Sequence, residues 1–538
     1  MKTVKEQLKG GLVGSCQAAP GDPLEDTDAI RRIARAVTAA GVSGLRINSP
    51  EDIAAIRQDT QLPIIGIQKR YENGMLRITP DFASAAALAK AGASIIALDC
   101  TDRKWGFGEP WRELIAGIHG ELKLPVMADV ATLQEALTAT EAGADFVGTT
   151  LNGYTEETKG HDRFDWDLLE ELARRVKTPI IAEGHIATPI EARRAIACGA
   201  WCVVVGSAIT RPGSIAAGFV KAVRPVDGAA VGVDIGGTAI KASVVADDGT
   251  VSLTVQVATE ASRGRQAIAA GLTAAVGEVL ERAREEGKNI SGIGIASAGA
   301  INARDGSVFA ATDNLPGWAG FGLRDFVEER FGLPVRAAND AQAAALAELY
   351  FGGGRTLDSF AAITVGTGVG GGFICGGRLI HGGHGFAGTF GHQTIAIGGR
   401  PCNCGRQGCL EAYVSTATLI EEYRVRADIG AAHGLTGATL ARKVSELALA
   451  GDAAAEGAYG ALAGYLAEGI ANVFNVLDPQ AVFLSGGLVE GHRRFVEEVA
   501  ERVQTLLHFG EKRTPRVELS TLGYLAGVQG AAALLRGD

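Results

Sequence analysis

Residues 231–241 read Val-Gly-Val-Asp-Ile-Gly-Gly-Thr-Ala-Ile-Lys, and this stretch decides the fold of the second half of the chain. The apolar run Ala229–Val233 predicts a strand, the two glycines predict a tight turn, and residues 243–245 resume an extended pattern. Together they predict a hairpin that opens a domain. Because glycine has no Cβ, successive backbone N–H groups in such a turn can approach and bind a polyanion. Asp234 stands before the turn, where it can hold a hydrated Mg²⁺ beside bound phosphates.

An ordinary glycine-rich β-turn would explain this motif equally well if it stood alone. Two more glycine-rich turns follow apolar runs later in the chain, at Thr364–Gly372 and at Val482–Gly487. Three such turns in this order resemble the actin-like ATPase domains of sugar kinases. The resemblance implies that ATP is bound, together with Mg²⁺, by Asp234, Gly236, Gly237, Thr238, Val365, Gly366, Thr367, Gly368, Gly370, Gly371, Gly372, Gly486 and Gly487.

The composition predicts a cytoplasmic protein of more than one globular domain. The chain has 538 residues, of which 47% are hydrophobic and 21% are charged, as is typical of folded protein. A net charge of −10 argues against nucleic acid and acidic membranes as partners. We find neither a secretory signal nor an apolar run near the ~20 residues of a spanning helix. Eight cysteines in so long a chain favour a reducing compartment over a disulfide framework.

The first 220 residues repeat one unit, in which an apolar, β-branched run precedes a polar loop and an alanine-rich stretch of helical spacing. Eight runs have this character: Gly11–Cys16, Gly44–Asn48, Pro63–Gln68, Ser94–Asp99, Pro125–Asp129, Phe146–Thr150, Pro179–Glu183 and Cys202–Gly206. Eight strand–helix units predict a (β/α)8 barrel. In that fold the chemistry lies at the C-terminal ends of the strands.

Polar groups stand at all eight of these strand ends and would surround one barrel mouth. They are Gln17, Arg46, Lys69 with Arg70, Asp99 with Thr101 and Arg103, Asp129, the run Thr149–Tyr154, Glu183 with Gly184, and Gly206 with Ser207 and Arg211. Any one of them could be a solvated loop residue, but so many around one mouth indicate a site. The turns after strands seven and eight fit the phosphate cradle that barrels often build there, with Arg211 balancing the charge.

Lys69 and Glu183 suggest a proton-transfer reaction. A lysine desolvated in a barrel mouth can lose its charge near neutral pH and act as a base. A carboxyl group opposite it can act as the acid. Two such groups on opposite faces of a carbon next to a carbonyl could invert that carbon. Two alternatives remain open for Lys69, namely a clamp for a phosphate or carboxylate and a Schiff-base lysine.

Six segments of this half are similar to the N-acylmannosamine-6-phosphate 2-epimerase (NanE) family: Gly11–Gln17, Ile64–Arg70, Leu98–Arg103, Gly148–Tyr154, Ala182–Gly184 and Gly206–Arg211. The resemblance implies that Lys69 is the base and Glu183 the acid. It also implies that Gln17, Arg46 and Asp129 bind or orient the sugar. The sugar would open to an aldehyde before C2 loses its proton, and no cofactor is implied.

The second half resembles the ROK sugar kinases, with N-acetylmannosamine kinases as the nearest group. In that family Asp340 would take the proton of the sugar 6-hydroxyl as it attacks the γ-phosphate, and Asn339 would hold a neighbouring hydroxyl. A helix N-cap is the alternative for Asp340, since residues 341–349 read as a helix. The resemblance also places Asn314, His392 and Glu411 at the sugar.

Three cysteines follow a histidine with the spacing of a metal site. Cys402, Cys404 and Cys409 form a C-x-C-x4-C cluster that begins ten residues after His392. Three thiolates and one imidazole predict a closed, structural zinc site. One residue departs from the family pattern before this cluster, because Thr389 stands where many of these kinases have a sugar-binding glutamate. The sequence therefore does not predict which residue binds the C1–C2 end of the sugar.

Together the patterns predict a 2-epimerase barrel at residues 1–224 and a ROK-type kinase at 225–538, joined by a short linker within Lys221–Ala230. The kinase would phosphorylate N-acetylmannosamine, and the barrel would convert the 6-phosphate to N-acetylglucosamine 6-phosphate, as in sialic acid catabolism. Kinase action on N-acetylglucosamine or glucose, or a regulatory sugar sensor, are alternatives. We expect amino sugars and ATP as partners, and a homo-oligomer.

Overall fold

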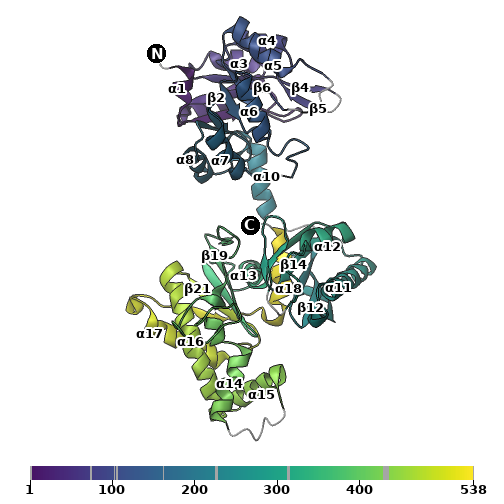
Figure 1. The fold of residues 1–538 in the computed structure, drawn as a ribbon, viewed down its shortest axis with the longest axis vertical. Coiled ribbons are helices and arrows are strands. Elements are labelled where there is room, and N and C mark those ends of the chain that lie inside the picture. Colours follow the sequence, from purple (N-terminus) through teal and green to yellow (C-terminus); the bar gives the residue numbers. More distant parts are fainter. Residues whose placement is uncertain are drawn as a thin grey trace. The chain divides into compact units, whose positions relative to one another are not determined.

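The computed structural model describes residues 3–72, 75–101, 103, 107–160, 163–223, 228–311, 315–427 and 435–536 (Figure 1). The chain divides into two compact units, Met1–Arg224 and Pro225–Asp538. Residues 224–227 at this division lie outside the described part, so the predicted linker is described only in part. Among the described residues, no helix is long and apolar enough to cross a membrane.

The first unit is a closed barrel of eight parallel strands, and the predicted (β/α)8 fold is confirmed. The strands are β1 (Leu12–Cys16), β2 (Gly44–Asn48), β3 (Ile64–Ile67), β6 (Ile95–Asp99), β7 (Val126–Asp129), β8 (Phe146–Gly148), β9 (Ile180–Ala182) and β10 (Cys202–Val205). Their order around the barrel is β1-β10-β9-β8-β7-β6-β3-β2. Each strand falls within its predicted run, and several are one or two residues shorter.

Side chains of successive strand residues alternate between two apolar cores, as the pleat of a strand requires. In β3, Ile65 and Ile67 belong to the core inside the barrel, whereas Ile64 packs between the barrel and its helices. The helices are α1 (Val4–Leu8), α2 (Thr27–Ala39), α3 (Pro50–Arg57), α4 (Phe82–Ala91), α5 (Trp111–Gly117), α6 (Leu133–Glu141), α7 (Trp166–Arg175), α8 (Pro189–Ala197), α9 (Ser207–Thr210) and α10 (Pro212–Val223), with a π-helical turn at Ile118–Leu122.

A hairpin that the sequence did not predict follows β3. It consists of β4 (Lys69–Glu72) and β5 (Met75–Ile78), with Lys69 paired to Ile78. The backbone N–H of Lys69 also donates to Asn48 Oδ1 over 2.9 Å, which ties the hairpin to the end of β2. Lys69 therefore lies at the base of the hairpin, where its backbone is fixed at both sides.

The second unit contains two five-stranded sheets. The first has the order β13 (Val251–Ala258), β12 (Ala239–Val245), β11 (Ala229–Ile235), β14 (Ile290–Ser297) and β17 (Val335–Asn339), beside a small pair of β15 (Ala300–Ile301) and β16 (Val308–Ala310). The second has the order β20 (Arg378–Leu379), β19 (Val369–Cys375), β18 (Phe360–Val365), β21 (Ala481–Ser485) and β22 (Val517–Leu519). The predicted hairpin is β11 with β12, and its register places Asp234 opposite Lys241.

Two helices, α13 (Asp340–Phe351) and α18 (Ala526–Ala533), pack on each other and cover the two sheets, as Figure 1 shows. Helix α18 lies on β11 and β14, and α13 lies on β18 and β19. A Cβ on Gly232 or Gly294 would overlap backbone atoms of α18, so glycine is required there for this close approach. The other helices are α11 (Arg265–Glu285), α12 (Leu323–Phe331), α14 (Thr416–Arg426), α15 (Gly437–Leu449), α16 (Ala453–Leu477) and α17 (Arg493–Leu506).

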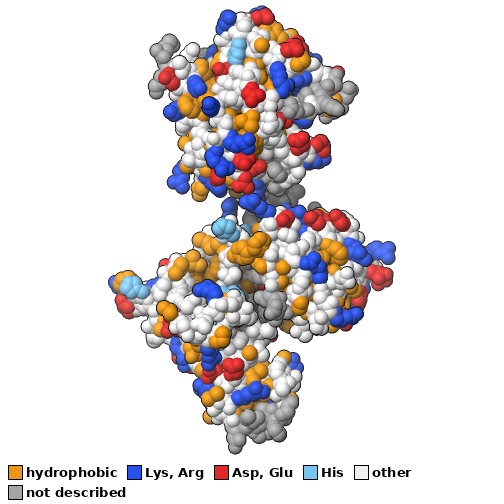
Figure 2. Space-filling model, viewed as in Figure 1, with side chains coloured by type: hydrophobic (Ala, Val, Ile, Leu, Met, Phe, Trp, Pro, Cys, Tyr) orange, Lys and Arg blue, Asp and Glu red, His pale blue; other side chains and the backbone are white. Residues whose placement is uncertain are grey.

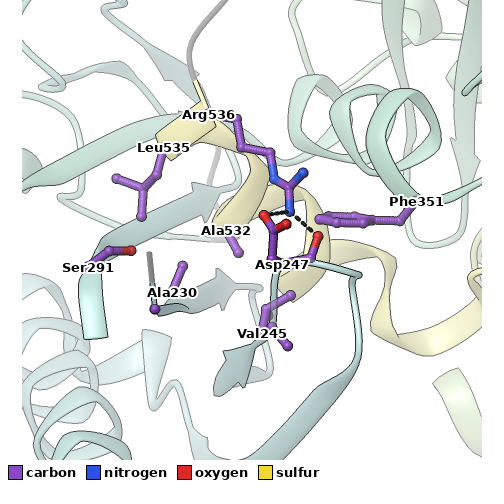
Figure 3. A pocket seen from close by; sticks show the side chains of 10 residues that line it. Ala230, Val245, Asp247, Ser291, Phe351, Ala532, Leu535 and Arg536 are labelled. Atoms are coloured by element: carbon purple, nitrogen blue, oxygen red, sulfur yellow. Dashed lines mark hydrogen bonds and ion pairs between the residues drawn. The ribbon is translucent and has the colours of Figure 1, made fainter. Parts of the chain in front are cut away.

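The 3-10 turn Leu534–Arg536 packs against the first sheet of the second unit. Arg536 donates to Asp247 Oδ1 over 2.7 Å and closes a small recess lined by Ala230, Val245 and Leu535 (Figure 3). On the face of the described residues drawn in Figure 2, lysine and arginine side chains are interspersed with aspartate and glutamate and do not gather in one field.

Neither unit takes a strand from the other, since the barrel strands lie between residues 12 and 205 and both sheets lie between 229 and 519. We therefore expect residues 1–226 and 227–538, expressed separately, to be soluble and to unfold cooperatively, because domains with complete cores can fold alone. Size-exclusion chromatography and thermal unfolding by circular dichroism, with the full chain as control, test this. Aggregation of either fragment would show that the two units depend on each other.

Candidate functional site

The centre of the barrel mouth is a guanidinium group held between two carboxylates. Arg46, on β2, is 1% exposed, and its Nη2 lies 2.6 Å from Oδ2 of Asp129, at the end of β7. Its Nη1 lies 3.2 Å from Asp129 Oδ1 and 3.1 Å from Oε2 of Glu183, directly after β9. The carboxyl ends of these strands meet at one end of the barrel, so the structure brings together three of the predicted site residues.

Two threonines that the sequence analysis treated only as part of a polar run hold Glu183 in this arrangement. Thr149 Oγ1 donates to the Glu183 carbonyl oxygen over 2.7 Å and accepts from the Glu183 N–H over 3.0 Å. Thr150 Oγ1 lies 2.6 Å from Asp129 Oδ1 and 3.1 Å from Glu183 Oε2. The position of both threonines directly after a strand indicated that they lie at the barrel mouth. It could not indicate that they bind Glu183 and Asp129.

The environment of Glu183 favours a carboxyl group that can hold a proton near neutral pH. Burial raises the pKa of Glu183 to about 7, and the negative charge of Asp129 acts in the same direction. The guanidinium of Arg46 opposes this rise, but Asp129 shares that guanidinium. Asp129 and Glu183 therefore share this guanidinium, and the pKa of Glu183 stays raised although Lys69 also acts to lower it.

Lys69 lies in the same environment, but its pKa is lowered rather than raised. Burial, together with the positive charges of Arg46 and Arg211, lowers the pKa of Lys69 to about 8. The nearby carboxylates of Glu183 and Asp129 act against this fall. A substantial share of Lys69 is therefore a neutral amine just above neutral pH, as a base requires.

The other predicted residues of the mouth have distinct surroundings. Gln17 donates from Nε2 to Ser15 Oγ over 2.8 Å, while its buried Oε1 has no hydrogen-bond partner. Gly184 has a left-handed backbone with φ of +97°. Gly206 precedes the short helix α9, which begins at Ser207, and Arg211 follows that helix. Four further residues of the mouth pair locally instead: Arg70 with Asp81 at 2.6 Å, and Asp99 with Arg103 at 2.7 Å and with Thr101 at 2.7 Å.

In the second unit, the predicted phosphate-binding turns lie between β11 and β12, between β18 and β19, and after β21. The second and third are in contact, because a Cβ on Gly486 (φ of +101°) would overlap the backbone of Val365. Asp234, at the first turn, is 3.7 Å from Lys241 Nζ. Burial raises the pKa of Asp234, and Lys241 opposes that rise.

Asp340 is the first residue of α13, and the helix N-cap is Asn339. The alternative that Asp340 is the cap is therefore wrong. Asn339 Oδ1 accepts from the N–H groups of Ala341 and Gln342, and its Nδ2 donates to the Gly299 carbonyl oxygen over 2.8 Å. Burial raises the pKa of Asp340 to about 6, with the negative charge of Asp234 adding to the rise.

Of two other residues predicted to bind the sugar, the structure describes Glu411 but not Asn314. Glu411 lies in a 3-10 turn, Leu410–Ala412, and its Oε2 accepts from the Val369 N–H over 2.9 Å. A Cβ on Gly368 would overlap the same carboxylate, so Glu411 packs directly against the second glycine-rich turn. Asn314 lies outside the described residues.

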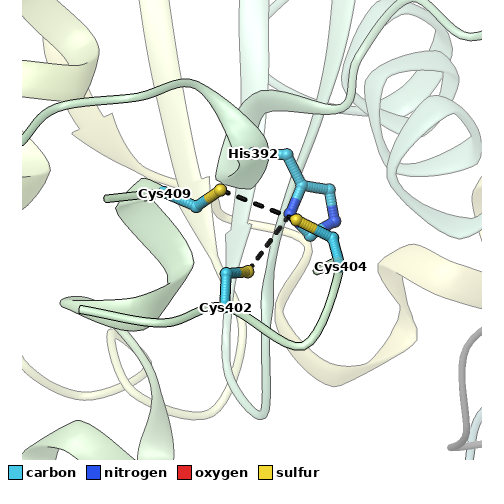
Figure 4. Close-up of side chains that lie close together, drawn as sticks. All are labelled: His392, Cys402, Cys404 and Cys409. Carbon is cyan, nitrogen blue, oxygen red and sulfur yellow. Dashed lines mark hydrogen bonds between the residues drawn. The ribbon is translucent and has the colours of Figure 1, made fainter. Parts of the chain in front are cut away.

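His392, Cys402, Cys404 and Cys409 form a compact cluster, and their ligand atoms all lie within 4.8 Å of one another (Figure 4). The Sγ atoms of Cys404 and Cys409 are 3.7 Å apart, and Cys402 Sγ is 3.7 Å from His392 Nδ1. Zn–S bonds of about 2.3 Å in a tetrahedron require ligand separations of about 3.8 Å, so these donors fit zinc. Thr389, just before the 3-10 turn of His392, is exposed and makes no capping hydrogen bond.

We expect the purified, reduced protein to contain about one zinc per chain. Cys404→Ser should remove the metal and lower the thermal midpoint of the second unit by about 5–10 °C, because each kcal/mol lost shifts a domain of this size by a few degrees. Elemental analysis and calorimetry measure both effects, with Cys375→Ser, at an exposed cysteine outside the cluster, as the control. Protein that lacks metal and keeps its midpoint in the variant would contradict the assignment.

Comparison with known proteins agrees with both halves of this arrangement. The ROK family matches residues 230–538, and the family described as "Putative N-acetylmannosamine-6-phosphate epimerase" (NanE) matches residues 30–225. The "Bifunctional enzyme NanE/NanK" of Brucella melitensis is 34% identical over 99% of this chain and 98% of its own length. A "Putative N-acetylmannosamine-6-phosphate 2-epimerase" of Thermosynechococcus vestitus is 47% identical over 38% of this chain and 89% of its own.

Among solved structures, a ROK family glucokinase from Streptomyces griseus, in complex with glucose and AMPPNP, is similar to the second unit. It is 34% identical, with a TM-score of 0.52, and the match covers 57% of this chain and 99% of that one. The two family matches and the near full-length relative agree on one assignment. The chain belongs to the bifunctional NanE/NanK enzymes, in which a NanE epimerase barrel precedes a ROK-family sugar kinase.

Proposed function

We propose that the chain carries out two successive reactions of sialic acid catabolism on one amino sugar. The second unit transfers a phosphoryl group from ATP to the 6-hydroxyl of N-acetylmannosamine. The barrel then epimerises C2 of the 6-phosphate to give N-acetylglucosamine 6-phosphate. The observation that carries the proposal is a pair of partly buried groups in the barrel mouth: Lys69, whose pKa burial lowers to about 8, and Glu183, which lies 3.1 Å from Arg46 and whose pKa burial raises to about 7.

The barrel reaction needs one base and one acid and no cofactor. In the open-chain sugar, the neutral amine of Lys69 takes the C2 proton, and the electrons of that C–H bond pass into an enolate with the C1 carbonyl. The carboxylic acid of Glu183 then gives its proton to C2 from the opposite face. Lys69 is left as an ammonium and Glu183 as a carboxylate, and exchange of one proton with solvent restores both groups.

The remaining polar groups of the mouth receive supporting roles in this proposal. Arg46, itself paired with Asp129, holds the Glu183 carboxyl, and the unpartnered Oε1 of Gln17 accepts a hydrogen bond from a sugar hydroxyl. Backbone groups of the turns at 184 and 206–207 bind the phosphate, and Arg211 neutralises part of its charge. Support for this assignment is the position of these turns after strands β9 and β10.

In the kinase, Asp340 accepts the proton of the 6-hydroxyl as that oxygen attacks the γ-phosphorus and ADP leaves. With a pKa of about 6, its carboxyl is mainly ionised at neutral pH and more basic than an exposed aspartate. The three glycine-rich turns bind the phosphates of ATP, and Asp234 is placed to hold Mg²⁺, which neutralises phosphate charge when bound. Asn339, Asn314, His392 and Glu411 are assigned to the sugar, and the zinc is structural.

Kinase action on N-acetylglucosamine or glucose is a second candidate. It is favoured by Thr389, which replaces the family glutamate, and by the similarity to a glucokinase of known structure. Incubation with Mg-ATP and each of the three sugars, followed by NMR of the products, distinguishes these possibilities. Phosphorylation of glucose at the highest kcat/KM would replace N-acetylmannosamine in the proposal without affecting the barrel.

Loss of either proton-transfer group should stop epimerisation and leave ADP formation intact. We expect Lys69→Ala and Glu183→Gln to lower the epimerisation rate by at least about 10²-fold, the usual scale for a lost acid or base. In D2O, the wild-type product should carry deuterium at C2. The same preparations, assayed for ADP with N-acetylmannosamine, provide an internal control. Full epimerase activity in Glu183→Gln would refute the assigned acid.

The pH dependence of epimerisation should be bell-shaped. The active form has neutral Lys69 and protonated Glu183. Below a pH of about 7 both groups are protonated, so Lys69 cannot act as the base, and above about 8 both have lost their protons, so Glu183 cannot act as the acid. We therefore expect kcat/KM to be highest between these values and to fall about tenfold per pH unit on either side. A rate that is flat from pH 6 to 9 would contradict these assignments.

Asp340→Asn should lower phosphoryl transfer by at least about 10²-fold, since the amide keeps the size of the side chain but cannot take a proton. ATP binding should be retained, because the glycine-rich turns are unchanged. Steady-state kinetics and binding of a non-hydrolysable ATP analogue measure the two effects separately. Near-normal turnover in this variant would remove Asp340 from its assigned role.

A further inference from the structure

Two neighbouring threonines at the end of β8 hold different parts of Glu183. Thr149 binds the backbone, with its hydroxyl donating to the Glu183 carbonyl oxygen over 2.7 Å and accepting from its N–H over 3.0 Å. Thr150 reaches the side chain, 3.1 Å from Oε2. Thr149 thus fixes the backbone of Glu183 without help from Thr150. Within Glu183, the Thr150 hydroxyl contacts only the side-chain carboxyl group.

The Thr150 hydroxyl lies between two carboxyl groups and has a single hydrogen to give. Its oxygen is 2.6 Å from Asp129 Oδ1 and 3.1 Å from Glu183 Oε2. A hydroxyl carries one donor hydrogen, so at any moment it can donate to one of these oxygens. Asp129 is bound by the Arg46 guanidinium through both of its oxygens and therefore acts as an acceptor. Whether Thr150 donates to Asp129 or to Glu183 must then depend on the charge that Glu183 carries.

Both contacts to Glu183 fall on the same oxygen. Arg46 Nη1 is 3.1 Å from Oε2, and so is Thr150 Oγ1. The carboxyl is therefore held by Oε2, and Oε1 is the oxygen that can carry the transferred proton. When Glu183 is neutral, Asp129 is the closer acceptor and the charged one, so it takes the Thr150 hydrogen. When Glu183 has lost its proton, Oε2 becomes an anionic acceptor that competes for the same hydrogen.

We propose that Thr150 is a positioning residue for the epimerase, whose hydroxyl turns from Asp129 toward Glu183 when Glu183 gives up its proton. The inference rests on the proposed role of Glu183 as the acid. The hydroxyl supports the carboxylate at the moment when its negative charge appears, in a site where Arg46 is already shared. It also keeps Oε2 fixed in both protonation states, so that Oε1 stays directed at the substrate.

The consequence is a measurable change in the titration of Glu183. Burial raises the pKa of Glu183 to about 7, and a hydrogen bond that strengthens in the ionised state restrains that rise. In the coupled pair the activity falls below the lower apparent pKa, which lies near that of Glu183, so removing the hydroxyl should move the acidic limb of the epimerase pH profile upward. A lost neutral donor to a carboxylate corresponds to a shift of about half to one pH unit.

The test compares Thr150→Val and Thr150→Ser in the full chain, by pH profiles of kcat and kcat/KM for epimerisation. Valine keeps the size of threonine without the hydroxyl, and serine keeps the hydroxyl without the methyl group. We expect the valine variant to show the upward shift and to lose about tenfold in kcat with little change in KM, because Thr150 acts through Glu183. We expect the serine variant to keep the wild-type limb.

Thr140→Val is the matched control. The Thr140 hydroxyl is buried in the same barrel, on α6, and has no hydrogen-bond partner, so the same substitution there should leave the profile unchanged. If the valine variant at position 150 does not fold, Thr150→Ala replaces it in the comparison with serine. ADP formation by the second unit confirms equal amounts of active chain in every preparation.

Two outcomes would overturn the inference. A valine or alanine variant with the wild-type limb and kcat would show that the hydroxyl does not act on Glu183. A serine variant as impaired as valine would show that the methyl group matters, and thus a packing role. The activity of Glu183→Gln shows whether the role of Thr150 fails alone or the proposed function fails with it. An active Glu183→Gln would refute the acid itself, whereas an inactive one beside a wild-type-like Thr150→Val refutes only the role of Thr150.

Discussion

The barrel site depends on one buried guanidinium that must serve two carboxylates. Arg46 and Asp129 are 1% and 0% exposed, and burial of charges at this depth is unfavourable unless they are paired. Replacing Arg46 would leave buried carboxylates without a cation, a change that typically destabilises a protein by about 3–5 kcal/mol. Since both oxygens of Asp129 contact the guanidinium, one of them at 2.6 Å, Glu183 receives only part of the positive charge. The same pairing therefore stabilises the barrel mouth and leaves Glu183 able to hold a proton.

In the kinase unit, burial and a neighbouring carboxylate also raise the pKa of an acidic side chain, that of Asp340. The pKa of Asp340 rises to about 6 through burial, and the negative charge of Asp234 adds to the rise. Neither unit needs an unusual residue type for the proton transfer that we propose. Each places a common acidic side chain at the start of a helix or the end of a strand, where burial and a neighbouring carboxylate set its proton affinity.

The strands and turns could be predicted because their signals are local. Each barrel strand is a short apolar run with buried side chains on both faces, and each glycine-rich turn is a contiguous motif. The hairpin at Lys69–Ile78 was missed because the strand Lys69–Glu72 is polar and largely exposed, so it has no apolar period to recognise. Thr150 was missed for another reason. Its partners Asp129 and Glu183 come from the ends of two other strands, and only the closed barrel brings the three together.

In the second unit, the metal cluster and the nucleotide turn are joined by a short run of contacts. Cys409 is followed within two residues by Glu411, whose carboxylate accepts the N–H of Val369 at the end of the second glycine-rich turn. A Cβ on Gly368 would overlap that carboxylate, so the two residues are in close contact. Zinc bound at Cys409 would therefore fix the position of Glu411, and through it the shape of the turn. A structural metal site can in this way be required for kinase activity while taking no part in phosphoryl transfer.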